Sequence, residues 1–411
     1  MKLIPNGVCA PIGFKAAGIH CGIRKNKAKK DLALIVSDTR AAAAAVYTTN
    51  LVHGAPITIT RENIANGYAQ AMICNSGNAN VCNANGIEIA RTMCAFVEQH
   101  SNIPATDVII ASTGVIGQPL PVEPIADGMS TLVGELSRDG WNDAANAIMT
   151  TDLREKIRAV EFELGGKTCR IGAIAKGSGM INPNMATMLA FITTDVAITP
   201  EMLQLAINRD VRNSFNMISV DGDTSTSDMM SIMANGMAGN ATIDSEGADF
   251  DTFCIALAKV TTYLAMEIAR DGEGAKKLIY CNVGGDIDDA DARIAAKSVI
   301  NSSLVKTMIF GADANVGRIM CAIGYSGADV DVSKIDIALI AGGAGAIKVC
   351  ENGIALQFDE DKAKNILEQT DITICIDIKD KDGNQSQKSN VVAWGCELTY
   401  DYVKLNGDYR S

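Results

Sequence analysis

Thr187 lies at an abrupt change of composition that can expose a reactive peptide bond. The preceding stretch, GSGMINPN at 177–184, is rich in glycine, asparagine and proline, which are the residues of tight turns. From Met185 the chain continues as MATMLAFI, an apolar run typical of a core element. A hydroxyl at such a crossing can attack the carbonyl before it, which makes the Ala186–Thr187 bond a candidate for self-cleavage. A threonine that simply packs in the core is the alternative interpretation.

Cleavage before Thr187 would give this residue a free α-amine. The pKa of an α-amino group is about 7.7 to 8.0, so near neutral pH the amine can accept the proton of the threonine hydroxyl. A hydroxyl activated in this way is a nucleophile for acyl transfer. The chain has only three histidines, His20, His53 and His100, and none has a partner at the spacing of a zinc site or of a Ser-His-Asp triad. No metal is therefore expected.

Two other motifs favour structural roles. The stretch AGGAGAIK at 341–348 resembles a phosphate-binding loop but lacks the required glycine and lysine spacing, and a strand is expected to follow it, so a turn is predicted. The stretch SVDGDTSTSD at 219–228 contains Asp221, Asp223 and Asp228, but it departs from the calcium-loop pattern. A hydrogen-bonded polar loop is predicted there, with metal-dependent phosphate chemistry as the alternative.

Length and charge restrict the class of protein. With 411 residues the chain exceeds the roughly 250 to 300 residues of a single core, so two lobes are expected. The net charge is −12, and no basic cluster and no basic-aromatic interleaving is expected to offset it, so nucleic acid is not an expected partner.

The location expected from the sequence is the cytoplasm. No apolar run approaches the roughly 18 to 20 residues of a membrane span, and the interrupted amino terminus does not match a signal peptide. The twelve cysteines are dispersed and form no CxxC pair, so they are interpreted as reduced core residues.

Strands and helices are mixed along the whole chain, which predicts an α/β or α+β fold. Short apolar runs rich in β-branched residues predict strands at 31–38, 55–60, 70–77, 107–114, 277–285, 335–343, 353–361, 371–380 and 391–405. Segments of helical period predict helices at 86–100, 121–137, 200–216 and 249–274.

Several of these segments together resemble one family. The stretch KGSGMINPNMATMLAFITTD resembles the cleavage-site segment of the ornithine acetyltransferases, the self-processing glutamate/ornithine N-acetyltransferases of arginine biosynthesis. The similarity runs nearly end to end and includes GVCAPIGFKAAGIHCGI, DLALIVSDTRAAAAAVYTTN, NSGNAN, ASTGVIG, AIMTTD, SVDGDTSTSD, ARDGEGA, LVKTMIFGADANVGRI and VKLNGDYRS. One departure is Val316, where the family often has tryptophan.

The resemblance implies a role for particular residues. Thr187 corresponds to the nucleophile and new amino terminus, and Thr113 and Gly114 correspond to the oxyanion-hole pair. The substrate contacts carry over to Thr150, Lys176, Thr187, Glu273, Asn406 and Ser411. The residue chemistry is compatible with these roles: Lys176 suits an α-carboxylate, Glu273 suits a cationic amine, and an Asn-Gly turn at 406–407 can bring the last residues back to the site.

The resemblance also implies a fold, a reaction and an assembly. The fold is a layered α/β sandwich superficially like the amino-terminal-nucleophile hydrolases, made of an alpha chain, 1–186, and a beta chain, 187–411, in an α2β2 assembly. The reaction moves an acetyl group from N2-acetylornithine to glutamate without a cofactor, and some members also use acetyl-CoA as a co-substrate. Two alternatives are a related self-processing aminopeptidase and a non-enzymatic small-molecule binding protein.

Overall fold

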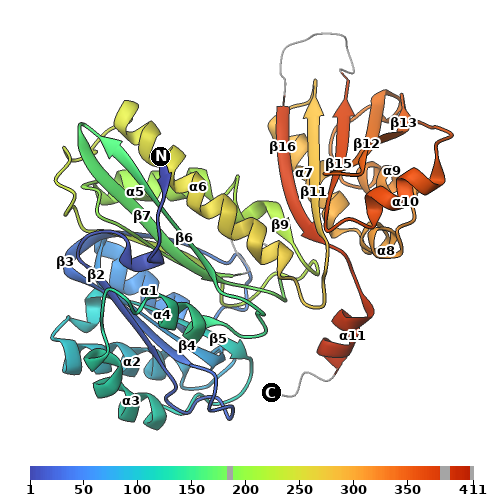
Figure 1. Ribbon diagram of the computed structural model, residues 1–411. Helices are drawn as coiled ribbons and strands as arrows, with labels where there is room; N and C mark the ends of the chain where they lie inside the picture. Colours follow the sequence, from blue (N-terminus) through green and yellow to red (C-terminus); the bar gives the residue numbers. More distant parts are fainter. Residues whose placement is uncertain (183–187, 380–388, 408–411) are drawn as a thin grey trace.

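The computed structural model describes residues 1–182, 188–379 and 389–407, and it arranges them in two lobes, each built on one β-sheet (Figure 1). The first lobe holds a nine-stranded mixed sheet in the order β1-β6-β7-β8-β10-β3-β4-β5, with β2 paired to β3. Its strands are β1 Lys2–Leu3, β2 Phe14–Ile19, β3 Leu32–Tyr47, β4 Tyr68–Asn78, β5 Val108–Val115, β6 Lys156–Leu164, β7 Lys167–Lys176, β8 Leu189–Thr194 and β10 Met229–Ala234.

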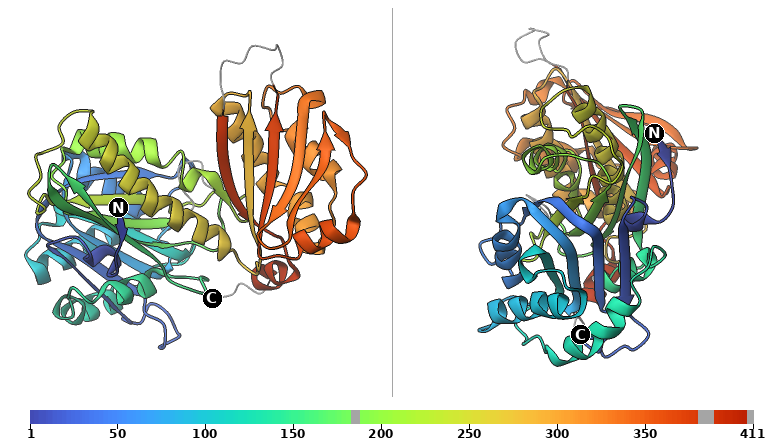
Figure 2. Two further views of the ribbon diagram at one scale, coloured as in Figure 1. Left: turned by 45° about the horizontal axis from the view of Figure 1, so that its top comes forward. Right: turned by 90° about the vertical axis from the view of Figure 1, so that its left-hand side faces the viewer.

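Helices cover this sheet on both faces, which buries strands such as β8 completely. The long helix α6 lies against β6 and β7, while α1, α2 and α3 pack around β5 and β2 at the other end of the sheet (Figures 1 and 2). The helices of this lobe are α1 Ala55–Asn63, α2 Gly86–Ser101, α3 Glu123–Gly134, α4 Trp141–Ile148, α5 Pro200–Asp210 and α6 Ala248–Arg270.

The second lobe holds a seven-stranded sheet in the order β14-β13-β12-β15-β11-β16-β9. Its strands are β9 Ile218–Ser219, β11 Leu278–Gly285, β12 Ile335–Ala341, β13 Gly345–Glu351, β14 Ile354–Ala355, β15 Asp371–Ile378 and β16 Ser389–Cys396. Its helices are α7 Asp289–Asn301, α8 Ser303–Gly311, α9 Val316–Gly324 and α10 Glu360–Leu367, and α11 Tyr400–Gly407 follows the last strand. Because β9 precedes β10 in the sequence, the chain enters the second sheet once before it completes the first.

Most predicted elements are present near their predicted bounds. The strands expected at 31–38, 70–77 and 107–114 are β3, β4 and β5, and the four predicted helices are α2, α3, α5 and α6. The fold is α/β, as predicted. The stretch at 341–348 contains the turn between β12 and β13, as predicted, and its second half, from Gly345, already belongs to β13.

Three strand predictions are wrong in whole or in part. Residues 55–60 form α1, because Gly54 precedes it in an extended conformation and Pro56 fits the first helical turn, where its missing N–H costs nothing. Of 353–361 only Ile354 and Ala355 are extended, and α10 follows, capped by the Asp359 carboxylate, which accepts from the Lys362 amide at 3.0 Å.

The strand predicted at 391–405 ends at Cys396. The helix α11 begins at Tyr400, and in its first turn the Tyr402 amide donates a 3.4 Å hydrogen bond to the Thr399 hydroxyl. This helix runs through Asn406 and Gly407, so the predicted Asn-Gly turn is also wrong.

The cysteines and the longest helix bear on the remaining sequence predictions. Seven of the twelve cysteines are buried, in agreement with their interpretation as core residues, whereas Cys82 and Cys321 are exposed.

Of the helices in the described ranges, α6 alone is long and apolar enough to cross a membrane, and half of its most apolar window is buried inside the protein, as is usual for a core helix. Among the described residues no group of three His, Cys, Asp or Glu side chains is placed to hold a metal ion.

Candidate active site

Thr113, Gly114 and Lys176 lie together near the ends of two strands. Thr113 and Gly114 directly precede the last residue of β5, and Lys176 is the last residue of β7. The Lys176 ammonium donates a 3.5 Å hydrogen bond to the Thr113 hydroxyl, and both side chains are buried. The structure therefore brings together three of the residues to which the resemblance assigned a role.

Gly114 has a backbone conformation that few other residues adopt. Its φ angle is +131°, and an added Cβ would lie 2.4 Å from the Gly77 carbonyl carbon and 2.6 Å from the Asn78 amide nitrogen of β4. The pairing of β4 with β5 is irregular here, since Asn78 lies opposite both Thr113 and Val115. A bulge of this kind can re-aim backbone groups next to a reactive site.

The polar loop at 219–228 holds the chain just before the candidate cleavage segment. The Asp221 carboxylate accepts from the Met180 amide at 2.6 Å and from the Ile181 amide at 2.8 Å. Met180 has a left-handed φ of +55°, which costs a non-glycine residue roughly 1 to 2 kcal/mol. The prediction of a hydrogen-bonded polar loop is confirmed, and sequence reasoning missed that Asp221 fixes this turn.

The described chain resumes at Met188 and enters the core at once. Leu189, the first residue of β8, pairs with Lys176 of β7. The Met188 carbonyl accepts from the Met229 amide of β10 at 3.0 Å, and β8 is then buried along its whole length. This confirms the predicted core character of the apolar run from Met188 onward. Ala186, Thr187 and Ser411 lie outside the described residues.

A buried ion triad joins three of the predicted substrate segments. The Lys156 ammonium lies 2.7 Å from the Asp152 carboxylate and 2.6 Å from the Asp271 carboxylate, and all three side chains are buried. Asp152 also accepts from the amides of Thr150 and Gly177, at 2.9 and 2.7 Å. These two amides belong to the predicted contact Thr150 and to the residue after the predicted contact Lys176.

The other acid of the triad, Asp271, is linked to Glu273 through Ser178. The Asp271 carbonyl accepts from the Ser178 hydroxyl at 2.7 Å, and the Ser178 carbonyl accepts from the Glu273 amide at 2.9 Å. Sequence reasoning missed Lys156, the first residue of β6, because KIRAVEFEL holds four charged residues and nothing in it marks this lysine as buried.

The pKa values of two buried acids near Lys176 are shifted in opposite directions. Burial alone would raise the pKa of Asp152, but the charges of Lys156 and Lys176 hold it well below its usual value, so this carboxylate is ionised. Burial raises the pKa of Asp228 well above its usual value, against the opposing effects of a Ser225 hydrogen bond and the Lys176 charge.

Glu273 and Asn406 are also in contact. The Asn406 amide of α11 donates to the Glu273 carboxylate at 2.8 Å. The carboxylate fills the space beside Gly179, where an added Cβ would lie within 2.5 Å of its atoms. Gly274, at φ +73°, allows α11 to approach, because a Cβ there would lie 2.6 Å from the Tyr402 amide nitrogen. As Figure 1 shows, α11 leaves the second lobe and returns toward the first.

Thr150 and Gly114 line a cavity of about 540 Å³. Residues of the segment 24–30 also line it, including Arg24, Lys25 and Lys29. This segment reads RKNKAKK and has five cations in seven residues, so the expectation that the sequence holds no basic cluster is wrong.

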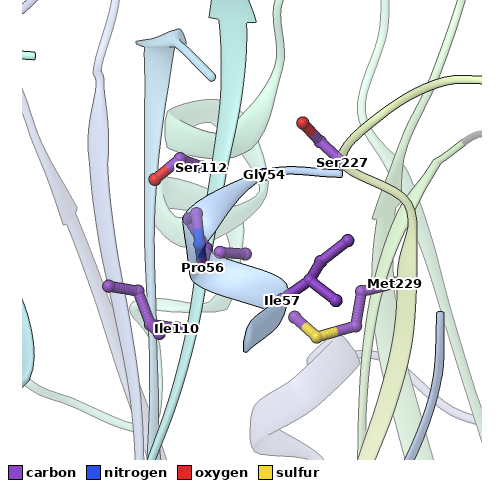
Figure 3. Close-up of a pocket in the computed structure, with 8 residues that line it drawn as sticks. Gly54, Pro56, Ile57, Ile110, Ser112, Ser227 and Met229 are labelled. Atoms are coloured by element: carbon purple, nitrogen blue, oxygen red, sulfur yellow. The ribbon is translucent and has the colours of Figure 1, made fainter. Parts of the chain in front are cut away.

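A second, much tighter gap lies between the first turn of α1 and the strands β5 and β10. Figure 3 shows Pro56 and Ile57 of α1 between Ser112 and Ile110 of β5 on one side and Met229 of β10 on the other. The gap leaves no room for a water-sized sphere, so it is a packing feature and does not hold a ligand.

Known proteins match the chain over its whole length. The arginine biosynthesis bifunctional protein ArgJ of Caldanaerobacter subterraneus subsp. tengcongensis is 48% identical, and that of Symbiobacterium thermophilum is 46% identical, each over 100% of both chains. Among solved structures, the bifunctional protein ArgJ of Bacillus halodurans is 42% identical, covers 45% of this chain and 97% of its own, and gives a TM-score of 0.43.

The ornithine acetyltransferase of Mycobacterium tuberculosis, solved in complex with ornithine, is 34% identical over 45% of this chain and 99% of its own, with a TM-score of 0.42. The sequence model of the ArgJ family matches residues 15–411. With this match and the full-length identity to its relatives, the chain belongs to the ArgJ family.

Proposed function

We propose that this chain is a self-cleaving acetyltransferase of arginine biosynthesis that moves the acetyl group of N2-acetylornithine to glutamate. The observation that supports this most is the meeting of Lys176 with Thr113 and Gly114, at strand ends that flank the segment containing Thr187. Full-length identity to bifunctional ArgJ proteins supports the same reaction.

Processing comes first in the proposed sequence of reactions. The Thr187 hydroxyl attacks the Ala186 carbonyl, the peptide C–N bond breaks, and an ester joins Ala186 to the threonine oxygen. Water hydrolyses this ester and leaves Thr187 with a free hydroxyl and a free α-amine. The fixed turn at Met180 and Ile181 on one side and the buried strand β8 on the other hold the ends of the reacting segment.

Transfer then takes place in two half-reactions. The α-amine of Thr187 accepts the hydroxyl proton, the oxygen attacks the acetyl carbonyl, and ornithine leaves with that proton. Thr113 and the Gly114 amide stabilise the oxyanion, a contribution of about 3 to 4 kcal/mol for each donor of this type. The amine of glutamate then attacks acetyl-Thr187 and departs as N-acetylglutamate.

The proposed substrate contacts divide by charge. Lys176 and Thr150 face the α-carboxylate of the amino acid, and Glu273 with Asn406 and Ser411 receives its cationic group. Acetyl-CoA is proposed as a second acetyl donor, which would give the two activities of a bifunctional enzyme.

The proposed cleavage leaves the two chains, 1–186 and 187–411, locked together, and we place the α2β2 assembly in the cytoplasm. The nine-stranded sheet is made of both: β8 of the second chain pairs with β7 of the first, and β10 of the second pairs with β3 of the first. The family match does not favour the aminopeptidase or the binding-protein alternative.

Kinetics and mass spectrometry test this function. A covalent acetyl-enzyme requires parallel double-reciprocal lines for N2-acetylornithine and glutamate. With N2-acetylornithine alone, the fragment that begins at Thr187 should gain about 42 Da, the mass of one acetyl group. Intersecting lines without an adduct would contradict the covalent mechanism.

A further inference from the structure

The segment 24–30 concentrates positive charge next to the candidate oxyanion hole. The whole chain has a net charge of −12, yet five of these seven residues are cationic. Arg24, Lys25 and Lys29 line the cavity of about 540 Å³ together with Gly114 and Thr150. All residues that line this cavity are described, and none of them is an aspartate or a glutamate.

The segment has a defined structure at its base. The buried carboxylate of Asp31 accepts from the amides of Cys21, Gly22 and Arg24, at 2.6, 3.3 and 2.9 Å. The Arg24 guanidinium donates to the Met149 carbonyl, which is followed by the cavity residue Thr150. These hydrogen bonds therefore fix the first residue of the cationic segment, Arg24, and the residues before it.

The contact of Arg24 with β4 depends on a glycine. Gly77 has a φ of +98°, and an added Cβ would lie 2.9 Å from Cγ of Arg24. Gly77 is itself a cavity residue and pairs with Gly114 across β4 and β5. The same pair of glycines thus joins the cationic wall to the candidate oxyanion hole.

Two of the cations are available to a ligand. Lys25 and Lys29 are exposed, and neither forms an ion pair with any residue in the described ranges, whereas Lys30 lies 2.7 Å from Asp143. Like charges held this close repel one another, and the potential of such a wall attracts an anion with several charges. Lysine ammonium groups are frequent ligands of phosphate.

We propose that this cavity binds the phosphate groups of a nucleotide-bearing acyl-thioester donor, the class that includes acetyl-CoA, and directs its acyl end to Gly114. The proposal rests on the proposed function, because it requires Thr187 as the acceptor. In the step, the bond from the Thr187 oxygen to the acyl carbon forms and the carbon–sulfur bond breaks. The hydroxyl proton passes through the α-amine to the sulfur, and the donor leaves as a free thiol.

The test compares two double variants of equal charge. Lys25→Gln/Lys29→Gln removes two charges from the cavity wall. Lys2→Gln/Lys27→Gln removes two charges elsewhere: Lys27 belongs to the same segment but borders a separate hollow with Asp127 and Glu135. For the first variant, kcat/KM with acetyl-CoA relative to kcat/KM with N2-acetylornithine should fall at least tenfold, in keeping with the loss of close charge contacts. For the second variant this ratio should stay at its wild-type value.

The binding of coenzyme A and its fragments shows whether the cavity recognises the phosphate groups of the donor. In titration calorimetry, coenzyme A should bind wild type more tightly than dephospho-coenzyme A and pantetheine, and the cavity variant should lose this order. Equal ratios in the two double variants would overturn the proposal, as would binding of inorganic phosphate with the affinity of coenzyme A. If wild type transfers acetyl from N2-acetylornithine but neither uses acetyl-CoA nor binds coenzyme A, the cavity assignment fails while the proposed function stands. If neither donor acetylates Thr187, both fail.

Discussion

At the scale of single residues, the site depends on one hydroxyl and one glycine at the end of β5. The Thr113 hydroxyl accepts a 3.5 Å hydrogen bond from the Lys176 ammonium. Gly114 has a φ angle of +131°, and a side chain at this position would clash with the backbone of β4. The hydroxyl and the amide are separated by one peptide unit, so they can reach the same developing oxyanion. In the proposed mechanism Lys176 has two roles: it polarises the Thr113 hydroxyl and supplies a charge near the substrate carboxylate.

Thr113→Val tests the hydroxyl without a change of shape. We expect kcat to fall by about 100-fold, because one oxyanion donor of this kind contributes roughly 3 kcal/mol, while the melting temperature changes little. Steady-state kinetics with N2-acetylornithine and glutamate measure the effect. Thr113→Ser keeps the hydroxyl and is the matched control, so an equal loss in both variants would argue against a donor role.

At the scale of elements, a buried triad holds together the strand ends and loops of the site. Lys156 of β6 joins Asp152, in the loop after α4, to Asp271, at the end of α6. The Asp152 carboxylate accepts from the amides of Thr150 and Gly177, and the Asp271 carbonyl is linked through Ser178 to the Glu273 amide.

Lys156→Met should destabilise the protein by about 3 to 5 kcal/mol, because it removes the buried cation shared by two buried carboxylates and leaves Asp271 with only the half-exposed Arg154, 3.6 Å away. Thermal unfolding would show a clear fall in melting temperature, and Lys167→Met, at the exposed start of β7, is the control. The additional change Asp271→Asn should recover part of the loss by removing one of the two charges. Equal melting temperatures for Lys156→Met and the control would contradict the structural role of the triad.

Asp210 gives the contact between α5 and α6 a dependence on pH. Its carboxylate accepts from the Thr261 hydroxyl of α6 at 2.9 Å and from the Ser214 hydroxyl at 3.0 Å. Burial raises the pKa of Asp210 to about 6, against these two hydrogen bonds. A carboxyl whose pKa is raised on folding contributes stability below its unfolded pKa, and this contribution is lost as the pH rises through about 6.

We therefore expect the stability of wild type relative to Asp210→Asn to fall by roughly 2 kcal/mol between pH 4 and pH 7. An amide can keep both hydroxyl contacts and does not ionise, so the variant lacks this pH dependence. Unfolding measured at several pH values gives the difference, with the exposed Asp244→Asn as the control. A difference that does not change with pH would show that Asp210 does not titrate in this range.

Sequence patterns located the elements of the site better than its contacts. The long periodic segment of α6 and the β-branched runs of β4 and β5 carry strong local signals, and these elements are where they were predicted. The helix α1 was missed because its alternating run APITIT has the period of a strand, and only Gly54 and Pro56 mark a helix start. The pairing of Lys156 with Asp271 joins residues 115 positions apart, which no local pattern shows.

At the scale of the whole molecule, the last helix connects the second lobe to the site in the first. The helix α11 follows β16 of the second sheet, and its Asn406 contacts Glu273, which follows α6 of the first lobe. A substrate held by this contact would bind between residues from distant parts of the chain.

Deletion of residues 408–411 tests the role of the carboxyl terminus. Self-cleavage requires Thr187 and the oxyanion donors, whereas transfer must also position an amino acid closely for a useful rate. The truncated protein should therefore still divide into two chains, while kcat/KM for N2-acetylornithine falls by more than about 100-fold, a loss of roughly 2.7 kcal/mol of transition-state stabilisation. Normal turnover would remove Asn406 and Ser411 from the proposed substrate contacts.

The most direct test of the proposed function is the covalent state of Thr187. Wild type and Thr187→Ala would be purified in parallel and compared by denaturing gel electrophoresis, intact mass and amino-terminal sequencing. The proposed function predicts that wild type gives two fragments, one beginning at Thr187, while Thr187→Ala remains one chain of 43.3 kDa. Thr187→Ser should still divide, because it keeps the hydroxyl. A wild-type protein that remains a single chain, or an alanine variant that divides at the same bond, would contradict the central claim.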